Sequence, residues 1–145
     1  MATSAVLNQE ALAQQVLQDT FGYQHFRPGQ QTIINEALSG RDCLAVMPTG
    51  GGKSLCYQIP ALVREGLTLV VSPLISLMKD QVDQLLANGV AAAYLNSTMT
   101  RDQQQTVMAD CRTGRVKLLY IAPERLMMDN FLDSLAHWQP AMLAV

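Results

Sequence analysis

Residues 47–54 read Met-Pro-Thr-Gly-Gly-Gly-Lys-Ser, and these residue types suit the binding of phosphate groups. Adjacent glycines accept positive φ angles, so their N–H groups can curl around an anion. The Lys53 ammonium would meet the outer phosphates of a nucleotide, and the Ser54 hydroxyl would ligate Mg²⁺. The general pattern begins with glycine where this chain has Met47. The candidate ligands are Thr49, Gly50, Gly51, Gly52, Lys53 and Ser54, of which Lys53 and Ser54 are the candidate catalytic residues.

A second candidate segment, residues 21–30, carries aromatic and amide groups that suit the recognition of a base. The Gln30 amide can donate and accept at once, which matches the N6 and N7 edge of adenine. Tyr23 or Phe26 could stack on a purine, and Arg27 could lie over the ring or reach a phosphate. The aromatic residues could equally anchor the first helices, and composition leaves both interpretations open.

Polar residues follow three further apolar runs of the chain. Ser72 comes after residues 67–71, Ser97 after residues 91–95, and Glu124 with Arg125 after residues 116–122. Loops at the carboxyl ends of parallel strands meet ligands, and hydroxyl and cationic groups suit a phosphate backbone. Serine at such positions also commonly caps a helix, and Arg125 could instead pair with Glu124 or another acid.

The elements that would position these residues are short apolar runs alternating with helical patterns. Continuous apolar runs are typical of buried parallel strands, and the alternation predicts an α/β fold with helices on both faces of a parallel sheet. A strand before the glycines and a helix after them is the setting that a phosphate loop requires. The predicted strands are residues 43–46, 67–71, 91–95, 116–122 and 142–145; the predicted helices are residues 5–20, 30–38, 53–64, 73–87, 100–111 and 130–138.

Length and charge limit the possible functions. A chain of 145 residues is long enough for one compact domain. We expect a helical segment over residues 1–20 and a nucleotide-binding domain over residues 21–145. The formal net charge of −2 lacks the positive excess of many nucleic-acid-binding domains, so any contact with nucleic acid must be local.

The cysteines and the N-terminus argue against a secreted or zinc-binding protein. Cys43, Cys56 and Cys111 are odd in number and form no C-x-x-C pair, so the sequence indicates neither a disulfide framework nor a zinc site. We expect Cys43 and Cys56 to be reduced core residues. Residues 1–10 contain no secretion signal, and no apolar stretch is long enough for a membrane span. A cytoplasmic protein is therefore expected.

Four ordered motifs together resemble one known family. Residues 21–30, the loop at 47–54, Ser-Pro-Leu-Ile-Ser-Leu-Met-Lys-Asp-Gln at 72–81 and Tyr-Ile-Ala-Pro-Glu-Arg at 120–125 are similar to the motifs of the RecQ family of ATP-dependent DNA helicases, in superfamily two. The resemblance runs from about residue 16 to the end, and Met47 fits the family's version of the loop. It implies a RecA-like lobe, the first of two motor lobes.

The resemblance also implies roles. Tyr23, Arg27 and Gln30 would contact the adenine nucleotide, with ATP and Mg²⁺ as cofactors. The loops of Ser72 and of Glu124 with Arg125 would face DNA, single-stranded or partly duplex. Members of the family hydrolyse ATP to unwind DNA in the 3′ to 5′ direction during recombination and repair, so we expect a nucleoid-associated protein of the cytoplasm.

The family's remaining catalytic parts are not found in these residues. Its members carry Asp-Glu-x-His after the strand that begins here at Met142, and a second motor lobe beyond it. We expect an incomplete lobe, truncated at its C-terminus, that hydrolyses ATP poorly and does not unwind DNA by itself. The alternatives are another phosphate-loop enzyme, such as a small-molecule kinase, and a non-catalytic nucleotide-binding module. A kinase would need an arginine-rich lid, which the sequence does not indicate.

Overall fold

The computed structural model describes residues 4–48, 50 and 52–145. The chain forms two compact units, Met1–Glu65 and Gly66–Val145, and each is described by itself. Helix α1 lies within the first unit, together with the segment that holds the candidate nucleotide ligands. The predicted division at residue 20 stays a prediction. None of the helices in the described ranges is long and apolar enough to cross a membrane.

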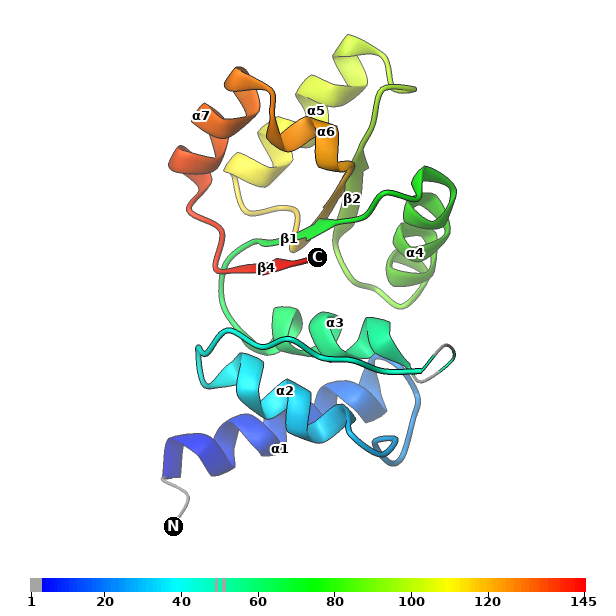
Figure 1. Cartoon of the computed structure of the whole chain (residues 1–145), viewed down its shortest axis with the longest axis vertical. Coiled ribbons are helices and arrows are strands. Elements are labelled where there is room, and N and C mark those ends of the chain that lie inside the picture. The colour runs from blue at the N-terminus through cyan, green and yellow to red at the C-terminus, as the bar shows by residue number, and fades with distance from the viewer. Residues whose placement is uncertain (1–3, 49, 51) are drawn as a thin grey trace. The chain divides into compact units, whose positions relative to one another are not determined.

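The described residues of the first unit form the helices α1 (Ser4–Asp19), α2 (Gln30–Leu38) and α3 (Lys53–Val63) (Figure 1). Apolar residues four apart lie on one face of a helix, so each helix presents a short apolar stripe. These stripes meet in a core to which α1, α2 and α3 all contribute. The predicted bounds of α2 and the start of α3 are confirmed. The core residues are Ala13, Leu17, Ile34, Leu38 and Ile59.

The predicted strand at residues 43–46 is wrong. These residues form neither helix nor strand, and their side chains are exposed, with Leu44 93% and Val46 91% accessible. The segment belongs to the unit Met1–Glu65, in which the described residues form no strand. A parallel strand exists only where neighbouring strands supply ladder hydrogen bonds, so an apolar run without such neighbours does not become a strand. Cys43, expected in the core, is exposed for the same reason.

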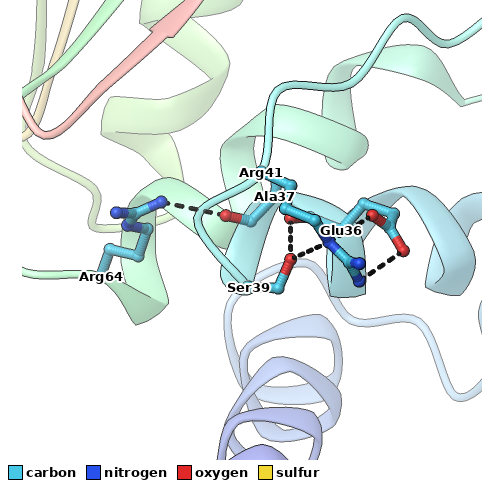
Figure 2. A network of polar contacts seen from close by, with 5 residues as sticks. All are labelled: Glu36, Ala37, Ser39, Arg41 and Arg64. Atoms are coloured by element: carbon cyan, nitrogen blue, oxygen red, sulfur yellow. Dashed lines mark hydrogen bonds and ion pairs between the residues drawn. The ribbon is translucent and has the colours of Figure 1, made fainter.

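A polar network closes the C-terminal end of α2 (Figure 2). The Ser39 hydroxyl donates to the Glu36 carbonyl at 2.6 Å, and Arg64 Nη1 donates to the Ala37 carbonyl at 2.9 Å. Arg41 places Nε 3.0 Å and Nη2 3.1 Å from the two carboxylate oxygens of Glu36. The last carbonyls of a helix lack partners within the helix, so these bonds satisfy two of them. Arg64 thereby ties the end of α3 to α2, whose first residue is Gln30.

The second unit contains a parallel sheet of β1 (Thr68–Val71), β2 (Ala92–Leu95), β3 (Leu118–Ile121) and β4 (Met142–Ala144). The strand order is β2-β3-β1-β4, and every pairing is parallel. Burial of all four residues in both β1 and β3 agrees with the continuous apolar runs from which they were predicted. The register aligns Leu95, Ile121 and Val71, so β2, β3 and β1 end at the same edge of the sheet.

Helices cover this sheet. Helices α5 (Arg101–Arg112) and α7 (Asp129–Trp138) lie together on one side (Figure 1), where they share an apolar cluster with the strands. Helix α4 (Ile75–Ala87) packs on β2 and β3, and its buried side chains are not members of that cluster. The short helix α6 (Pro123–Leu126) connects β3 to α7. The predicted α/β class and parallel sheet are confirmed.

Candidate nucleotide site and strand-end loops

The glycine-rich loop enters α3 through left-handed backbone conformations. Gly50 has a φ of 79°, and Gly52, directly before the helix, has a φ of 77°. Both angles lie in the region that glycine adopts without steric cost, as expected of a loop that curls around an anion. Lys53 and Ser54 are the first residues of α3, beside N–H groups that lack partners within the helix. The predicted ligands Thr49 and Gly51 lie outside the described residues.

Gln30 is hydrogen-bonded to this loop through its side-chain amide. The side chain is only 1% exposed, and its amide is used in both directions. The Arg27 N–H donates to Gln30 Oε1 at 2.8 Å, and Gln30 Nε2 donates to the Gly52 carbonyl at 3.0 Å. A Cβ on Gly52 would overlap Gln30 Nε2, so the absence of a side chain at Gly52 makes room for the amide. Among the described residues, these two bonds use one of the two N–H groups and one of the two oxygen lone pairs of the Gln30 amide.

Arg27 makes a second connection between the two predicted segments. Its Nη1 donates to the Gly50 carbonyl at 2.6 Å. Residues 27 and 30 therefore contact two carbonyls of the phosphate loop, more than twenty positions along the chain. Sequence reasoning placed Arg27 and Gln30 near a base and missed these bonds, because no local pattern signals a contact at that separation.

The aromatic residues of the 21–30 segment divide into two groups. Phe21 and Phe26 are half-buried and pack against the core of the three helices, as the anchoring interpretation expects. Tyr23 is 52% exposed, which leaves its ring face available to a planar ligand. Tyr23 belongs to the 21–30 segment, which contacts the phosphate loop through Arg27 and Gln30.

Cys56 lies one turn into α3. Its thiol is buried, with Sγ 3.6 Å from Met47 Sδ and 3.8 Å from the Gly52 carbonyl oxygen. Burial, and to a smaller extent Cys43, raises the pKa of Cys56 and keeps the thiol neutral. The expectation that Cys56 is a core residue is confirmed.

The predicted nucleic-acid residues gather at one edge of the second unit. Because β1, β2 and β3 end in register, the residues that follow them are brought to the same edge. Ser72 is half-buried there, and Ser97 and Glu124 are exposed. The Ser72 hydroxyl accepts from the Leu74 N–H at 3.3 Å, which is a local turn and not a cap of α4, because the helix begins at Ile75 without a side-chain cap bond. That bond leaves the hydroxyl proton of Ser72 for another acceptor.

Arg125 has an environment that the sequence did not reveal. Its Cζ lies 5.9 Å from the centroid of the Phe131 ring. Within the described residues Arg125 forms no ion pair, with Glu124 or with any other acid. Its Nε is buried and has no hydrogen-bond partner in the described part of the chain. The guanidinium is thus a cation at the edge of the sheet whose charge no carboxylate of these residues neutralises.

Comparison with known proteins places these features in a family. The family model described as DEAD/DEAH box helicase matches residues 27–139. The chain is 56% identical over 130 residues to the ATP-dependent DNA helicase RecQ of Haemophilus influenzae, covering 90% of this chain and 21% of that protein. It is 55% identical over 139 residues to RecQ of Pasteurella multocida, covering 96% and 22%, and 48% identical over 134 residues to RecQ of Bacillus subtilis, covering 92% and 23%.

The chain therefore spans about a fifth of the length of these relatives. The resemblance to RecQ helicases that the four motifs indicated is confirmed over most of the chain. The matched residues include Arg27, Gln30, the phosphate loop and all three strand-end loops. The chain belongs to the DEAD/DEAH box helicase family.

Proposed function

We propose that this chain is the nucleotide-binding lobe of an ATP-dependent DNA helicase, and that it binds ATP with Mg²⁺ and contacts DNA. The observation that carries the nucleotide part is the set of bonds from Arg27 and Gln30 to the Gly50 and Gly52 carbonyls. Those bonds join the Gln30 amide to glycines with positive φ angles at a helix N-terminus. That combination suits a ligand with an adenine at one end and phosphates at the other.

The loop would enclose the phosphates. N–H groups of Gly50, Gly52, Lys53 and Ser54 would face the phosphate oxygens, and the exposed Lys53 ammonium would neutralise the outer phosphates. The Ser54 hydroxyl would be a Mg²⁺ ligand. The ion would draw charge from the phosphates, and Lys53 and Ser54 would hold them in line for attack by water.

The base would lie beside the 21–30 segment. The second N–H and lone pair of the Gln30 amide would pair with the N7 and N6 groups of adenine, while its bond to the Gly52 carbonyl keeps the amide oriented. Tyr23 supplies an exposed ring for stacking. Arg27 would exchange its bond to the Gly50 carbonyl for a position over the purine or against a phosphate.

DNA would lie along the edge at which β1, β2 and β3 end. Backbone contacts suit a motor that must move over any sequence, and hydroxyl and guanidinium groups make such contacts. Ser72, Ser97 and Arg125, with Glu124 beside it, are the proposed contacts to a single-stranded or partly duplex DNA. Unwinding in the 3′ to 5′ direction, and roles in recombination and repair, belong to the same proposal for the protein that contains this lobe.

A nucleotide-selectivity experiment tests the proposal. Binding of ATP and GTP to the chain is measured by calorimetry in Mg²⁺ for the parent, Gln30→Ala and Lys53→Ala. Lys53→Ala should weaken both nucleotides by a similar factor, because the ammonium contacts only phosphates. Gln30→Ala should lose the preference for ATP over GTP, because a site built to pair with one base edge discriminates by its hydrogen bonds. A preference for ATP that survives in Gln30→Ala would refute the assignment of the base-reading residue.

A further inference from the structure

The guanidinium of Arg125 is held by a ring instead of an acid. Its Cζ lies 5.9 Å from the Phe131 ring centroid, within the range at which an aromatic quadrupole attracts a cation. Arg125 takes part in none of the ion pairs formed by the described residues. Its Nε is out of contact with water and unbonded in those same residues. Leaving a buried donor unpaired destabilises a fold, so this arrangement calls for a reason other than stability.

Phe131 is itself firmly fixed. The side chain is 1% exposed and belongs to the apolar cluster between the sheet and helices α5 and α7, with Leu119 and Ile121 among its members. Trp138, seven residues further along α7, meets it edge to face at a centroid distance of 5.8 Å and an interplanar angle of 84°. Such T-shaped pairs are favourable and restrict ring motion. The ring is therefore a rigid support at the place where Arg125 leaves the sheet edge.

A ring and a carboxylate would have different consequences for an arginine that binds phosphate. A carboxylate would fix the side chain and also neutralise it, so that a phosphate would have to displace the acid. An aromatic ring attracts the guanidinium without carrying a net charge, and the hydrogen-bonding edge of the planar group stays free. The ring therefore limits the side-chain entropy that the arginine loses when it binds an anion. The positive charge of the guanidinium remains available to that anion.

We propose that Phe131 is a positioning residue that holds the Arg125 guanidinium at the strand-end edge, un-neutralised, for a phosphate of the DNA backbone. The inference rests on the proposed DNA contact of Arg125 and names the residue that sets it up. Phe131 touches no DNA in this scheme and acts only through Arg125.

Binding of a fluorescently labelled oligo-dT to the whole chain, followed by anisotropy over a series of salt concentrations, tests the inference. The variants are Arg125→Ala, Phe131→Leu, Arg125→Ala with Phe131→Leu, and a chain carrying trifluorophenylalanine at position 131. Fluorination preserves the shape of the ring and removes its attraction for a cation, so it separates the electrostatic role from packing. Leu132→Ala, an exposed site on the same helix, is the matched control.

Arg125→Ala should weaken binding and reduce the slope of log K against log salt by about 0.7, the value for one lost phosphate contact on a single strand. Phe131→Leu and the fluorinated chain should each weaken binding by about 2- to 5-fold, which corresponds to the lower end of the range for a cation–ring interaction. Phe131→Leu should not weaken binding further once Arg125 is alanine, and Leu132→Ala should bind as the parent does.

The outcomes separate the two claims. A chain that does not bind the oligonucleotide, or an Arg125→Ala variant with the parent's affinity and salt slope, overturns the proposed DNA contact and the inference with it. If Arg125→Ala weakens binding while the fluorinated chain binds as the parent does, the DNA contact stands and the positioning role of Phe131 is refuted. This second result holds whatever Phe131→Leu does, because loss of packing alone could explain an effect of leucine.

Discussion

Replacing Gly52 by alanine tests how Gln30 and the phosphate loop depend on each other. Gly52 and Gly50 have nearly the same left-handed backbone, with φ of 77° and 79°. Their surroundings differ, because a Cβ on Gly52 overlaps Gln30 Nε2, whereas a Cβ on Gly50 meets nothing within 4 Å. Gly50→Ala is therefore a control that introduces the same backbone strain without the collision.

The two variants should differ by a measurable free energy of unfolding. An alanine in the left-handed conformation lowers the free energy of unfolding by roughly 1–2 kcal/mol. Alanine also restricts the unfolded chain, which offsets about 0.4–1 kcal/mol of that loss. Gly50→Ala should thus cost about 1 kcal/mol. Gly52→Ala must also displace the buried Gln30 amide from the Arg27 N–H and the Gly52 carbonyl. Unpaired buried polar groups cost about 1–3 kcal/mol, so its total should reach about 2–4 kcal/mol.

Urea denaturation followed by circular dichroism measures both values, and a double-mutant cycle with Gln30→Ala identifies the cause. With the amide removed, the collision disappears, so Gly52→Ala in the Gln30→Ala background should cost no more than Gly50→Ala does in the parent. Equal costs for Gly52→Ala and Gly50→Ala in the parent chain would show that the Gln30 amide does not occupy the space beside Gly52, and the coupling argued above would be wrong.

Two further predictions concern the second unit. Burial raises the pKa of the Cys111 thiol from 9.0 to about 12, so above pH 9 the unfolded chain releases this proton while the folded chain keeps it. The free energy of unfolding should fall between pH 9 and 12 by up to about 1.4 kcal/mol per pH unit from this group, and Cys111→Ala should show a shallower fall in urea denaturation at the same pH values. An identical pH dependence in both chains would contradict this. Thr100 caps α5 through a reciprocal pair of hydrogen bonds with Gln103, at 3.0 and 3.2 Å. Thr100→Ala should therefore lower the free energy of unfolding, measured by thermal denaturation, by about 1 kcal/mol. Thr106→Ala, on the exposed side of the same helix, is the control, and equal losses at the two sites would count against the cap.

Local signals were sufficient for most elements and for the candidate site's composition. Gly29 and Gly40 flank α2, which spans the predicted residues, and the runs before Ser72 and Asn96 form strands β1 and β2 within a residue of the prediction. These features depend on periodicity, glycine punctuation and continuous apolar runs, which a short window of sequence contains. The same is true of the glycines and the following helix of the phosphate loop, whereas the strand expected before the glycines is absent from the described residues.

Long-range pairing decided what the sequence left open. Residues 43–46 have the composition of a buried strand, yet they are exposed and irregular, because strand formation depends on neighbours that a local pattern does not specify. Composition could not choose between base stacking and anchoring for the aromatic residues, and packing against the three-helix core places Phe26 with the anchors.

The sequence by itself determined which groups are present: a glycine loop ending in Lys53, an amide at Gln30, and a cation at Arg125 after an apolar run. Only the tertiary structure decided what each of them touches. Gln30 reaches the Gly52 carbonyl and Arg125 reaches the Phe131 ring because folding brings separate elements together. The physical reason is that residue type limits the bonds a side chain can make, whereas its partner is set by the packing of the elements that carry both.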